Sequence, residues 1–352
     1  MLKYVDDSRP GISRKRRGRY WMYFDADGNR IADRDEIDRL NAVGMPPAYE
    51  KCWFCPDPDG HIQAVGFDAK GRKQYRYHPS FREQQESRKY ERLARFGRCL
   101  PKLRKRLERD LQGKATARDT VLAAVVRLID ETRMRVGNEE YAKENKSFGA
   151  TTLRNRHARM ERGRLKITYA GKHGIKRTVT ISDRNLMRIA RRTQDLPGQN
   201  LFEFVAEDGS VCPVTSGDVN AYIKEAMGEE FTAKDFRTWG ASAIAFEEMV
   251  KRVEKHGSVK LKSVIEPVAE ALGNTPAISR KSYVHPALIE AAKDAGAIGA
   301  RKLPRAAQSL SRYERGLIEF LEALPGEQGR MATDKAARRR AEAKLERAAQ
   351  AA

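Results

Sequence analysis

The sequence predicts an α+β fold, in which a small β-rich N-terminal domain precedes a larger, mainly α-helical domain with a small β-sheet or hairpin. Short alternating segments rich in aromatic and β-branched residues, separated by Gly, Pro, Asp and Asn, fill residues 1–80. From Ser80 onward, long charged segments with apolar residues at helical spacing dominate. We therefore divide the 352 residues into domains at 1–85 and 86–328, followed by a charged, Ala-rich C-terminal tail at 329–352.

The predicted elements of the N-terminal domain are mainly strands. Aromatic residues at 20–24 run into the turn signal Asp25-Ala26-Asp27-Gly28-Asn29, which is typical of the end of a strand. The full set is, in order, a strand at 20–24, a short helix near 34–43, a strand at 52–55, a loop at 56–60, and strands at 62–67 and 73–77.

Two helical segments are expected to open the larger domain. The first is long and charged and extends to about Leu111. The second follows Asp119, a credible N-cap, and carries apolar residues at helical spacing. Its stop signal lies at 135–138, where Gly and Asn follow Arg and Val.

A β-hairpin and further capped helices are expected next. Strands at 165–169 and 177–181 are joined by a tip on which Lys172, close to two glycines, is free to project. The capping-box pattern at 232–235 predicts a helix that runs to about residue 253. A later helix is expected to end at Gly273 as its C-terminal cap.

Net charge indicates the kind of partner. The chain contains 69 Lys and Arg against 48 Asp and Glu, which gives a net charge of +21. Residues 1–80 hold 15 basic and 12 acidic residues, so most of the excess lies in the helical domain. A basic excess of this size indicates a polyanion, most simply nucleic acid.

Composition also excludes several classes of protein. No apolar stretch of about 18 residues is present, so we expect no membrane partner, and the start of the chain lacks the apolar run of a secretion signal. Four cysteines are too few for a disulfide framework, which favours the cytoplasm. Cys52 and Cys55 have no second ligand pair of suitable spacing and are interpreted as structural thiols rather than half of a zinc site.

Two segments of the N-terminal domain are candidates for contact with nucleic acid. The basic cluster Arg14–Arg19 is interpreted as a solvated or phosphate-contacting arm. Gln74, Tyr75 and Tyr77 lie among Lys and Arg residues, a mixture that suits a nucleic-acid surface. The same residues suit the wet face of an ordinary strand, so composition leaves both interpretations open.

Phosphoryl transfer is the chemistry that the candidate residues favour. Arg135 and Arg237 could hold the non-bridging oxygens of a phosphodiester by forked hydrogen bonds. Lys172 could protonate a leaving alkoxide, and Tyr283 could attack phosphorus. No paired-carboxylate metal site or phosphate-binding Gly motif competes in the sequence. The residues alone indicate a nucleic-acid binder, with metal-free phosphoryl transfer as one option.

The chain resembles the type IB DNA topoisomerases, and is most similar to the poxvirus-like bacterial subfamily, along nearly its whole length. Order, spacing and local structure of the matching segments all agree with that family. The segments are Arg135-Val136-Gly137-Asn138-Glu139-Glu140-Tyr141, Lys143-Glu144-Asn145, Thr151-Thr152-Leu153-Arg154-Asn155-Arg156-His157, Gly171-Lys172, Lys234-Asp235-Phe236-Arg237-Thr238-Trp239-Gly240, Leu272-Gly273-Asn274-Thr275-Pro276-Ala277-Ile278-Ser279-Arg280-Lys281-Ser282-Tyr283, and Gln74-Tyr75-Arg76-Tyr77.

The resemblance implies a catalytic role for five residues. Tyr283 would attack a DNA phosphodiester, form a 3′-phosphotyrosyl link and release a 5′-hydroxyl. Arg135 and Arg237 would offset the charge on the phosphoryl oxygens. Lys172 would be the general acid, and Asn274 would hydrogen-bond a non-bridging oxygen. The cut strand would swivel and be resealed, which relaxes positive and negative supercoils without ATP, metal or another cofactor.

The resemblance also implies how DNA is held. The two domains would close as a clamp around duplex DNA, with the N-terminal domain binding DNA and the helical domain carrying catalysis. We expect a monomer that needs no nucleotide cofactor and associates with the nucleoid. The residues expected to contact DNA are Gln74, Tyr75, Tyr77, Tyr141 and Lys234.

One position departs from the family pattern. Viral and eukaryotic members usually carry His where this chain has Asn274, and an Asn amide can donate a hydrogen bond but cannot supply a proton. His285 is expected to be a neighbouring surface side chain rather than a substitute. No residue of the sequence stands out as the proton acceptor for Tyr283, whose ordinary pKa is about 10.

Two other functions are weighed against this one. A tyrosine recombinase shares the chemistry, but those enzymes usually show His-x-x-Arg at the second arginine, where this chain has Lys234-Asp235-Phe236-Arg237. A β-rich N-terminal domain also fits the topoisomerase better. A non-catalytic basic nucleic-acid-binding protein is the other alternative, and the presence of all five catalytic positions argues against it.

Overall fold

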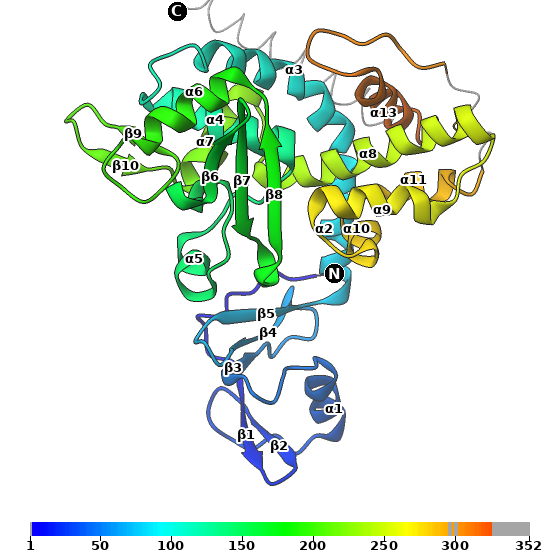
Figure 1. Cartoon of the computed structure of the whole chain (residues 1–352). Helices are drawn as coiled ribbons and strands as arrows, with labels where there is room; N and C mark the ends of the chain where they lie inside the picture. Colours follow the sequence, from blue (N-terminus) through cyan, green and yellow to red (C-terminus); the bar gives the residue numbers. More distant parts are fainter. Residues whose placement is uncertain (1, 295–297, 299–301, 326–352) are drawn as a thin grey trace, which may run out of the picture. The chain divides into compact units, whose positions relative to one another are not determined.

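A computed structural model describes residues 2–294, 298 and 302–325 of the chain. The protein divides into two compact units between Lys89 and Tyr90. The first unit contains an antiparallel sheet, and the second is mainly helical with small sheets (Figure 1), which confirms the predicted α+β class. The tail predicted at 329–352 lies outside the described residues.

The N-terminal unit is built on an antiparallel sheet of five strands. Its elements are β1 (Ile12–Arg17), β2 (Tyr20–Phe24), α1 (Arg34–Ala42), β3 (Glu50–Phe54), β4 (Ile62–Phe67) and β5 (Lys73–Tyr77). The strand order is β2-β1-β3-β4-β5, which leaves β5 at one edge. Buried apolar side chains, among them Ile12, Tyr23, Leu40 and Phe54, form a separate core between the sheet and α1.

The basic cluster at residues 14–19 belongs to this sheet, so its interpretation as an arm is wrong for Arg14. β1 pairs with both β2 and β3. The Arg14 guanidinium donates hydrogen bonds to the carbonyl oxygens of Met45 and Pro46, and its Cζ lies 3.9 Å from the centroid of a Trp21 ring. A planar cation stacked on an aromatic face stabilises the packing of the sheet rather than contacting phosphate.

The second unit contains the longest helices. Its helices are α3 (Leu93–Asp110), α4 (Arg118–Thr132), α5 (Glu139–Asn145), α6 (Arg184–Gln194), α7 (Ser216–Met227), α8 (Ala233–His256), α9 (Leu261–Leu272), α10 (Pro276–Ser282), α11 (Pro286–Ala291) and α13 (Arg312–Glu322), and α2 (Pro79–Glu91) leads into them. Strands β6 (Ala158–Glu161), β7 (Arg164–Ala170) and β8 (Lys176–Ile181) form an antiparallel sheet in that order, and β9 (Glu203–Val205) pairs with β10 (Val211–Pro213).

Local signals explain most of these boundaries. The predicted capping box opens α8, because Thr232 and Asp235 bond each other's backbone N–H groups, and Gly273 ends α9 in the left-handed conformation. The predicted cap at Asp119 is wrong, since α4 begins at Arg118 and Asp119 lies in its first turn. This helix also ends earlier than predicted, because Arg133 turns left-handed (φ +54°) and its N–H bonds Ile129 O at 2.8 Å.

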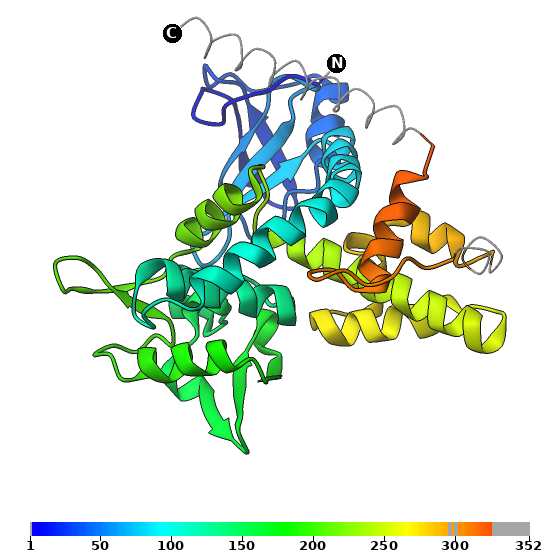
Figure 2. The same ribbon diagram turned by 90° about the horizontal axis from the view of Figure 1, so that it is seen from above.

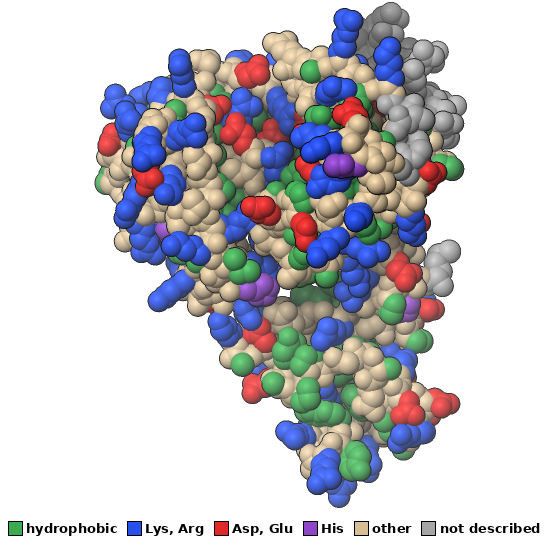
Figure 3. Space-filling view, turned by 45° about the vertical axis from the view of Figure 1, so that its right-hand side comes forward, with side chains coloured by type: hydrophobic (Ala, Val, Ile, Leu, Met, Phe, Trp, Pro, Cys, Tyr) green, Lys and Arg blue, Asp and Glu red, His purple; other side chains and the backbone are tan. Residues whose placement is uncertain are grey.

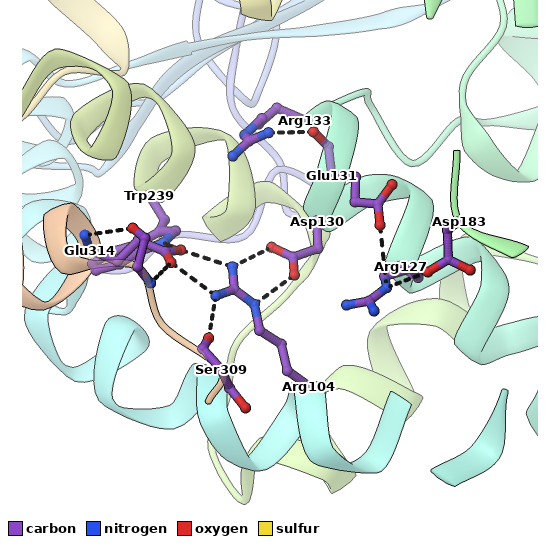
Figure 4. A network of polar contacts seen from close by, with 10 residues as sticks. Arg104, Arg127, Asp130, Glu131, Arg133, Asp183, Trp239, Ser309 and Glu314 are labelled. Atoms are coloured by element: carbon purple, nitrogen blue, oxygen red, sulfur yellow. Dashed lines mark hydrogen bonds and ion pairs between the residues drawn. The ribbon is translucent and has the colours of Figure 1, made fainter. Parts of the chain in front are cut away.

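The helices of the second unit are joined around Arg104 of α3. Its guanidinium forms ion pairs with Asp130 of α4 at 2.8 Å and with Glu314 of α13 at 2.8 Å, and donates to the carbonyl oxygen of Ser309 (Figure 4). The Trp239 indole of α8 donates to Glu314 at 3.3 Å. α13 therefore packs on α3 and α8, and its orange ribbon lies beside the yellow-green α8 in Figure 2.

Two kinds of site are absent from the described part of the chain. None of its helices is both long and apolar enough to cross a membrane. No group of three or more His, Cys, Asp or Glu side chains in this part could hold a metal ion. All four cysteines are free thiols, with Cys55 buried and Cys52 partly buried.

Candidate active site

Arg237 is the most buried member of the predicted site. It lies in the second turn of α8 and is only 4% exposed. Its guanidinium donates one hydrogen bond to the carbonyl oxygen of Arg133, at the end of α4. It donates another, at 3.1 Å, to the carbonyl oxygen of Leu272, at the end of α9. These two acceptors fix the side chain between three helices. Arg237 Nε is buried and has no hydrogen-bond partner among the described residues, so one donor is left for a ligand.

Arg135 reaches the site from the loop that follows α4. The left-handed turn at Arg133 redirects the chain, and Ala150 N then donates to Arg135 O at 2.9 Å, which fixes the loop. Gly137 has φ +106° and lies so close to Gly149 that a side chain at either position would collide with the other segment. The Arg135 side chain donates to Asn274 Oδ1 at 3.1 Å.

Asn274 is presented by the sharp end of α9. The preceding Gly273 adopts φ +59°, and Asn274 N donates to Ala269 O at 3.0 Å. Because Arg135 occupies the amide oxygen, the orientation of the amide is set. Its Nδ2 is buried without a partner in the described structure, so it is a second unused donor beside that of Arg237.

Tyr283 ends α10, a short helix that Thr275 caps through Ile278 N. The phenol ring is half-buried, and its centroid lies 5.0 Å from the Cζ of Arg237. Ser242, fully buried on α8, donates to Tyr283 O at 3.4 Å and accepts from His285 N at 3.1 Å. One helix, α8, therefore positions both the tyrosine and the arginine beside it.

The electrostatic environment activates the phenol. Burial by itself would raise the pKa of Tyr283, but the positive charges of Arg237 and Arg135 outweigh it and lower this pKa below its ordinary value. Burial, followed by repulsion from Arg135, lowers the pKa of Arg237. Two cations and two unused donors around a phenol form a site suited to an anion that a tyrosine can attack.

Lys172 lies apart from these residues. It occupies the tip of the β7–β8 hairpin, between Gly171 and a His173 residue with φ +64°. Its side chain is exposed and makes no hydrogen bond or ion pair with any residue that the structure describes. The structure thus brings together Arg135, Arg237, Asn274 and Tyr283 but leaves Lys172 at the end of a hairpin.

The predicted DNA-contacting residues lie on separate surfaces. Tyr75 and Tyr77 of β5 are 39% and 40% exposed, and their rings stack with centroids 5.8 Å apart and planes 11° apart. Gln74 Nε2 donates to Asp68 at 3.2 Å. In the helical unit, Tyr141 of α5 and Lys234 in the first turn of α8 are exposed. Lys and Arg side chains are spread over the visible face of this unit (Figure 3).

Sequence reasoning missed three residues of this region. Ser242 carried no signal, because a serine inside a helix is common. Tyr169 and Arg177 pair across β7 and β8 and border the site, but only the alternation of β7 hinted that Tyr169 points inward. All three act through contacts between segments far apart in the chain.

His285 is not the surface side chain that the sequence predicts. It is partly buried, caps α11 by accepting from Ala287 N, and packs edge-on against the Tyr90 ring with centroids 5.2 Å apart. Burial lowers its pKa to about 4, so the imidazole is neutral at physiological pH. Its role in the described structure is that of a helix cap.

Comparisons with known proteins identify families and relatives that the chain resembles. Residues 78–309 match the family model described as the catalytic core of eukaryotic DNA topoisomerase I, and residues 20–68 match that of the bacterial DNA topoisomerase IB N-terminal domain. A DNA topoisomerase 1B of Acanthamoeba polyphaga mimivirus is 34% identical over 78% of this chain and 85% of its own length. A DNA topoisomerase I of Monkeypox virus is 26% identical over 70% of this chain and 76% of its own length.

A solved structure of a recombinase shows a weaker likeness. The XerH site-specific recombinase bound to its difH substrate is 22% identical, with 55% of this chain and 52% of that chain covered and a TM-score of 0.34. This score is too low to bear on function.

Proposed function

The chain belongs to the type IB DNA topoisomerase family, and we propose that it relaxes supercoiled DNA by cutting and resealing one strand through a Tyr283 phosphotyrosyl intermediate. The observation that carries this proposal is the half-buried phenol of Tyr283 beside Arg237, with Arg135 and Asn274 joined next to it. This arrangement supports a nucleophile and an anion-binding site in one place.

The first step is attack on phosphorus. The Tyr283 oxygen forms a bond to the phosphorus of a DNA phosphodiester, its proton passes to solvent, and the bond to the 5′ oxygen breaks. The positive charges that lower the pKa of Tyr283 make this proton easier to lose, and the proposal assigns no dedicated base. The sequence offers no obvious proton acceptor for Tyr283, and loss of the proton to solvent does not require one.

The developing negative charge needs stabilisation. Arg237 Nε and Asn274 Nδ2 are the unused donors of the site, and they would bind non-bridging oxygens. Arg135 would add its charge while holding the Asn274 amide in place. In phosphoryl transfer, an arginine placed in this way is worth about 10³–10⁵ in rate.

The leaving 5′ oxygen needs a proton. Lys172 is the proposed donor, delivered when the β7–β8 hairpin closes on DNA, because its ammonium is exposed and unpaired among the described residues. After the cut strand has swivelled about the intact one, the 5′-hydroxyl attacks phosphorus and gives its proton to Lys172. The bond from phosphorus to the Tyr283 oxygen breaks, and Tyr283 leaves as the phenolate, which regains a proton from solvent. The phosphotyrosyl bond conserves the energy of the diester, so the cycle needs no ATP.

DNA binding is proposed to use both units. The stacked rings of Tyr75 and Tyr77 offer a surface for bases or sugars, and Gln74, Tyr141 and Lys234 offer polar and charged contacts. Closure of the two units as a clamp around duplex DNA, action as a monomer, and association with the nucleoid in the cytoplasm are parts of the same proposal. The recombinase alternative gains no support from residues 20–68, which match a topoisomerase domain.

Plasmid relaxation tests the proposal. The protein is expected to relax both negatively and positively supercoiled plasmid in EDTA without ATP. Tyr283→Phe should bind DNA as the wild type does but relax none, and only the wild type should leave a covalent 3′ protein–DNA adduct after denaturation. A fully active Tyr283→Phe variant would contradict the assignment of Tyr283 as the nucleophile. Exchange between two defined sites without general relaxation would favour a recombinase instead.

A further inference from the structure

The β7–β8 hairpin is fixed to the active site one residue pair before its strands end, although its tip is exposed. Tyr169 of β7 and Arg177 of β8 are directly paired, so their side chains lie on the same face of the sheet. Tyr169 is only 6% exposed, and burial raises its pKa while the charges of Arg177, Arg237 and Arg135 oppose that rise. The Tyr169–Arg177 pair therefore lies next to Arg135 and Arg237 of the active site.

Arg177 also binds the segment that presents Asn274. Its Nη2 donates to Ala271 O, in the last turn of α9, at 2.8 Å. A Cβ at Gly273 would lie 1.7 Å from Nη1 and 2.7 Å from Cζ of Arg177, so the guanidinium lies directly against the glycine. Gly273 is thus needed both for its left-handed conformation and for the space that Arg177 fills.

A small change in the contact between Arg177 and the end of α9 would move Lys172. Lys172 follows Tyr169 by three residues, which at about 3.3 Å per residue places it about 10 Å along the hairpin from the Tyr169–Arg177 pair. A tilt of about 6° at the pair would move the backbone of Lys172 by about 1 Å, and a displacement of that size can cost about 10² in rate.

We propose that Arg177 is a positioning residue for Lys172: by binding Ala271 and packing on Gly273, it holds the hairpin at the angle that delivers the acid to the leaving oxygen. This inference rests on the proposed function. Arg177 touches neither substrate nor the reacting atoms in this role and acts through the lysine. The hydrogen bond from Arg177 to Ala271 O also connects the hairpin that carries Lys172 to the turn that carries Asn274.

A change of leaving atom separates this role from a merely structural one. With the natural 5′ oxygen, the bond from phosphorus to oxygen breaks and the oxygen takes a proton from Lys172. With a bridging 5′ sulfur, the sulfur leaves as a thiolate, because thiols ionise near a pKa of about 8.5 and need no acid. We therefore compare single-turnover cleavage of two DNA duplexes, one with the natural 5′ oxygen and one with the 5′ sulfur. The ratio of the two rates shows how much of a variant's loss comes from proton delivery.

Arg177→Ala is expected to cleave the oxygen substrate about 10²-fold more slowly than the wild type, and to cleave the sulfur substrate at nearly the wild-type rate. Lys176→Ala is the matched control, since it removes a neighbouring exposed charge from the same strand and leaves the tether. It should cleave both substrates at nearly the wild-type rate. An Arg177→Ala enzyme that is equally slow on both substrates, or fully active on oxygen, overturns the inference.

A second variant keeps the inference testable if Arg177→Ala folds poorly. Arg177→Lys keeps a positive charge and a long side chain but loses the guanidinium Nη2 that bonds Ala271 O, so it should also slow cleavage of the oxygen substrate. Sulfur should rescue this defect as it does that of Arg177→Ala. An Arg177→Lys enzyme that is equally slow on both substrates counts against the tether. Wild-type protein that fails to cleave the oxygen substrate overturns the proposed function instead.

Discussion

Arg135 and Asn274 are 139 positions apart in the sequence, yet Arg135 Nη2 donates a 3.1 Å hydrogen bond to Asn274 Oδ1. This bond sets the orientation of the amide, because the oxygen is occupied by a cation and the nitrogen is the atom left to donate. The position where the family resemblance leads one to expect His is therefore occupied here by a neutral, oriented donor.

Asn274→Ala is expected to slow single-turnover DNA cleavage by about 10²–10³-fold with little effect on DNA affinity, since it removes one donor to the developing charge. Asn274→Asp should be slower still, because its carboxylate would pair with Arg135 and repel the phosphate. An Asp variant as active as the wild type would show that the amide donates nothing in the transition state.

The tyrosinate absorbance difference between wild type and Tyr283→Phe should titrate below pH 10, because the pKa of Tyr283 is lowered. A depressed pKa favours the phenolate in the folded state, so this stabilisation is present at high pH and is lost as the pH falls through the folded pKa. Arg135→Gln should move the titration upward, since it removes one of the two charges responsible. An unchanged midpoint in this variant would contradict that cause.

Ser242→Ala is expected to destabilise the protein by about 1 kcal/mol in urea unfolding, because it leaves the partly buried N–H of His285 without its acceptor. Cleavage should slow as well, since Ser242 also bonds Tyr283 O. Equal stability and equal cleavage rate in the variant would mean that the backbone around the nucleophile is held by other contacts.

Arg104→Met should cost about 3–5 kcal/mol, because it leaves the carboxylates of Asp130 and Glu314 partly buried and unpaired. Replacing all three charges together, as Arg104→Met, Asp130→Asn and Glu314→Gln, should restore much of the loss. Arg118→Met is the control, since its pair with Asp218 is half-exposed and worth about 1 kcal/mol or less. Thermal or urea unfolding measures each difference.

Tyr75→Ala and Tyr77→Ala are each expected to weaken DNA binding by about 1–3 kcal/mol if bases or sugars stack on the paired rings. The Phe variants should bind nearly as well, because they keep the ring. Lys234→Ala should instead reduce the slope of log affinity against log salt by about one, as expected for a single phosphate contact. Fluorescence anisotropy over a salt series measures both effects, and equal loss in the Phe and Ala variants would argue against stacking.

Local patterns were enough to predict part of the fold. The capping box that opens α8, the Gly273 cap of α9 and the β7–β8 hairpin depend on residues close together in sequence, and each appears as predicted. The end of α4 was missed because a non-glycine residue, Arg133, takes the left-handed conformation there. β1 was missed because its basic composition hid the packing of Arg14 on Trp21.

The candidate site was predictable only with the family resemblance. Arg135, Arg237 and Tyr283 carry no joint signal in composition, and their catalytic role stays a prediction. Ser242 and Arg177 could not be found from sequence, because their partners lie 41 and 94 residues away. Contacts of this kind become visible only when the helices are packed.

The place of β5 at the edge of its sheet has a consequence for solubility. No other described strand pairs with its outer side, so backbone donors and acceptors of β5 lack a strand partner there, beside two exposed tyrosines. Such an edge is a template on which a strand of another molecule can add and begin aggregation. Arg76, exposed on the same strand, opposes such pairing, because its charge repels the same residue of a second copy while attracting a polyanion. One cation on an edge strand can thus favour DNA over a second protein molecule.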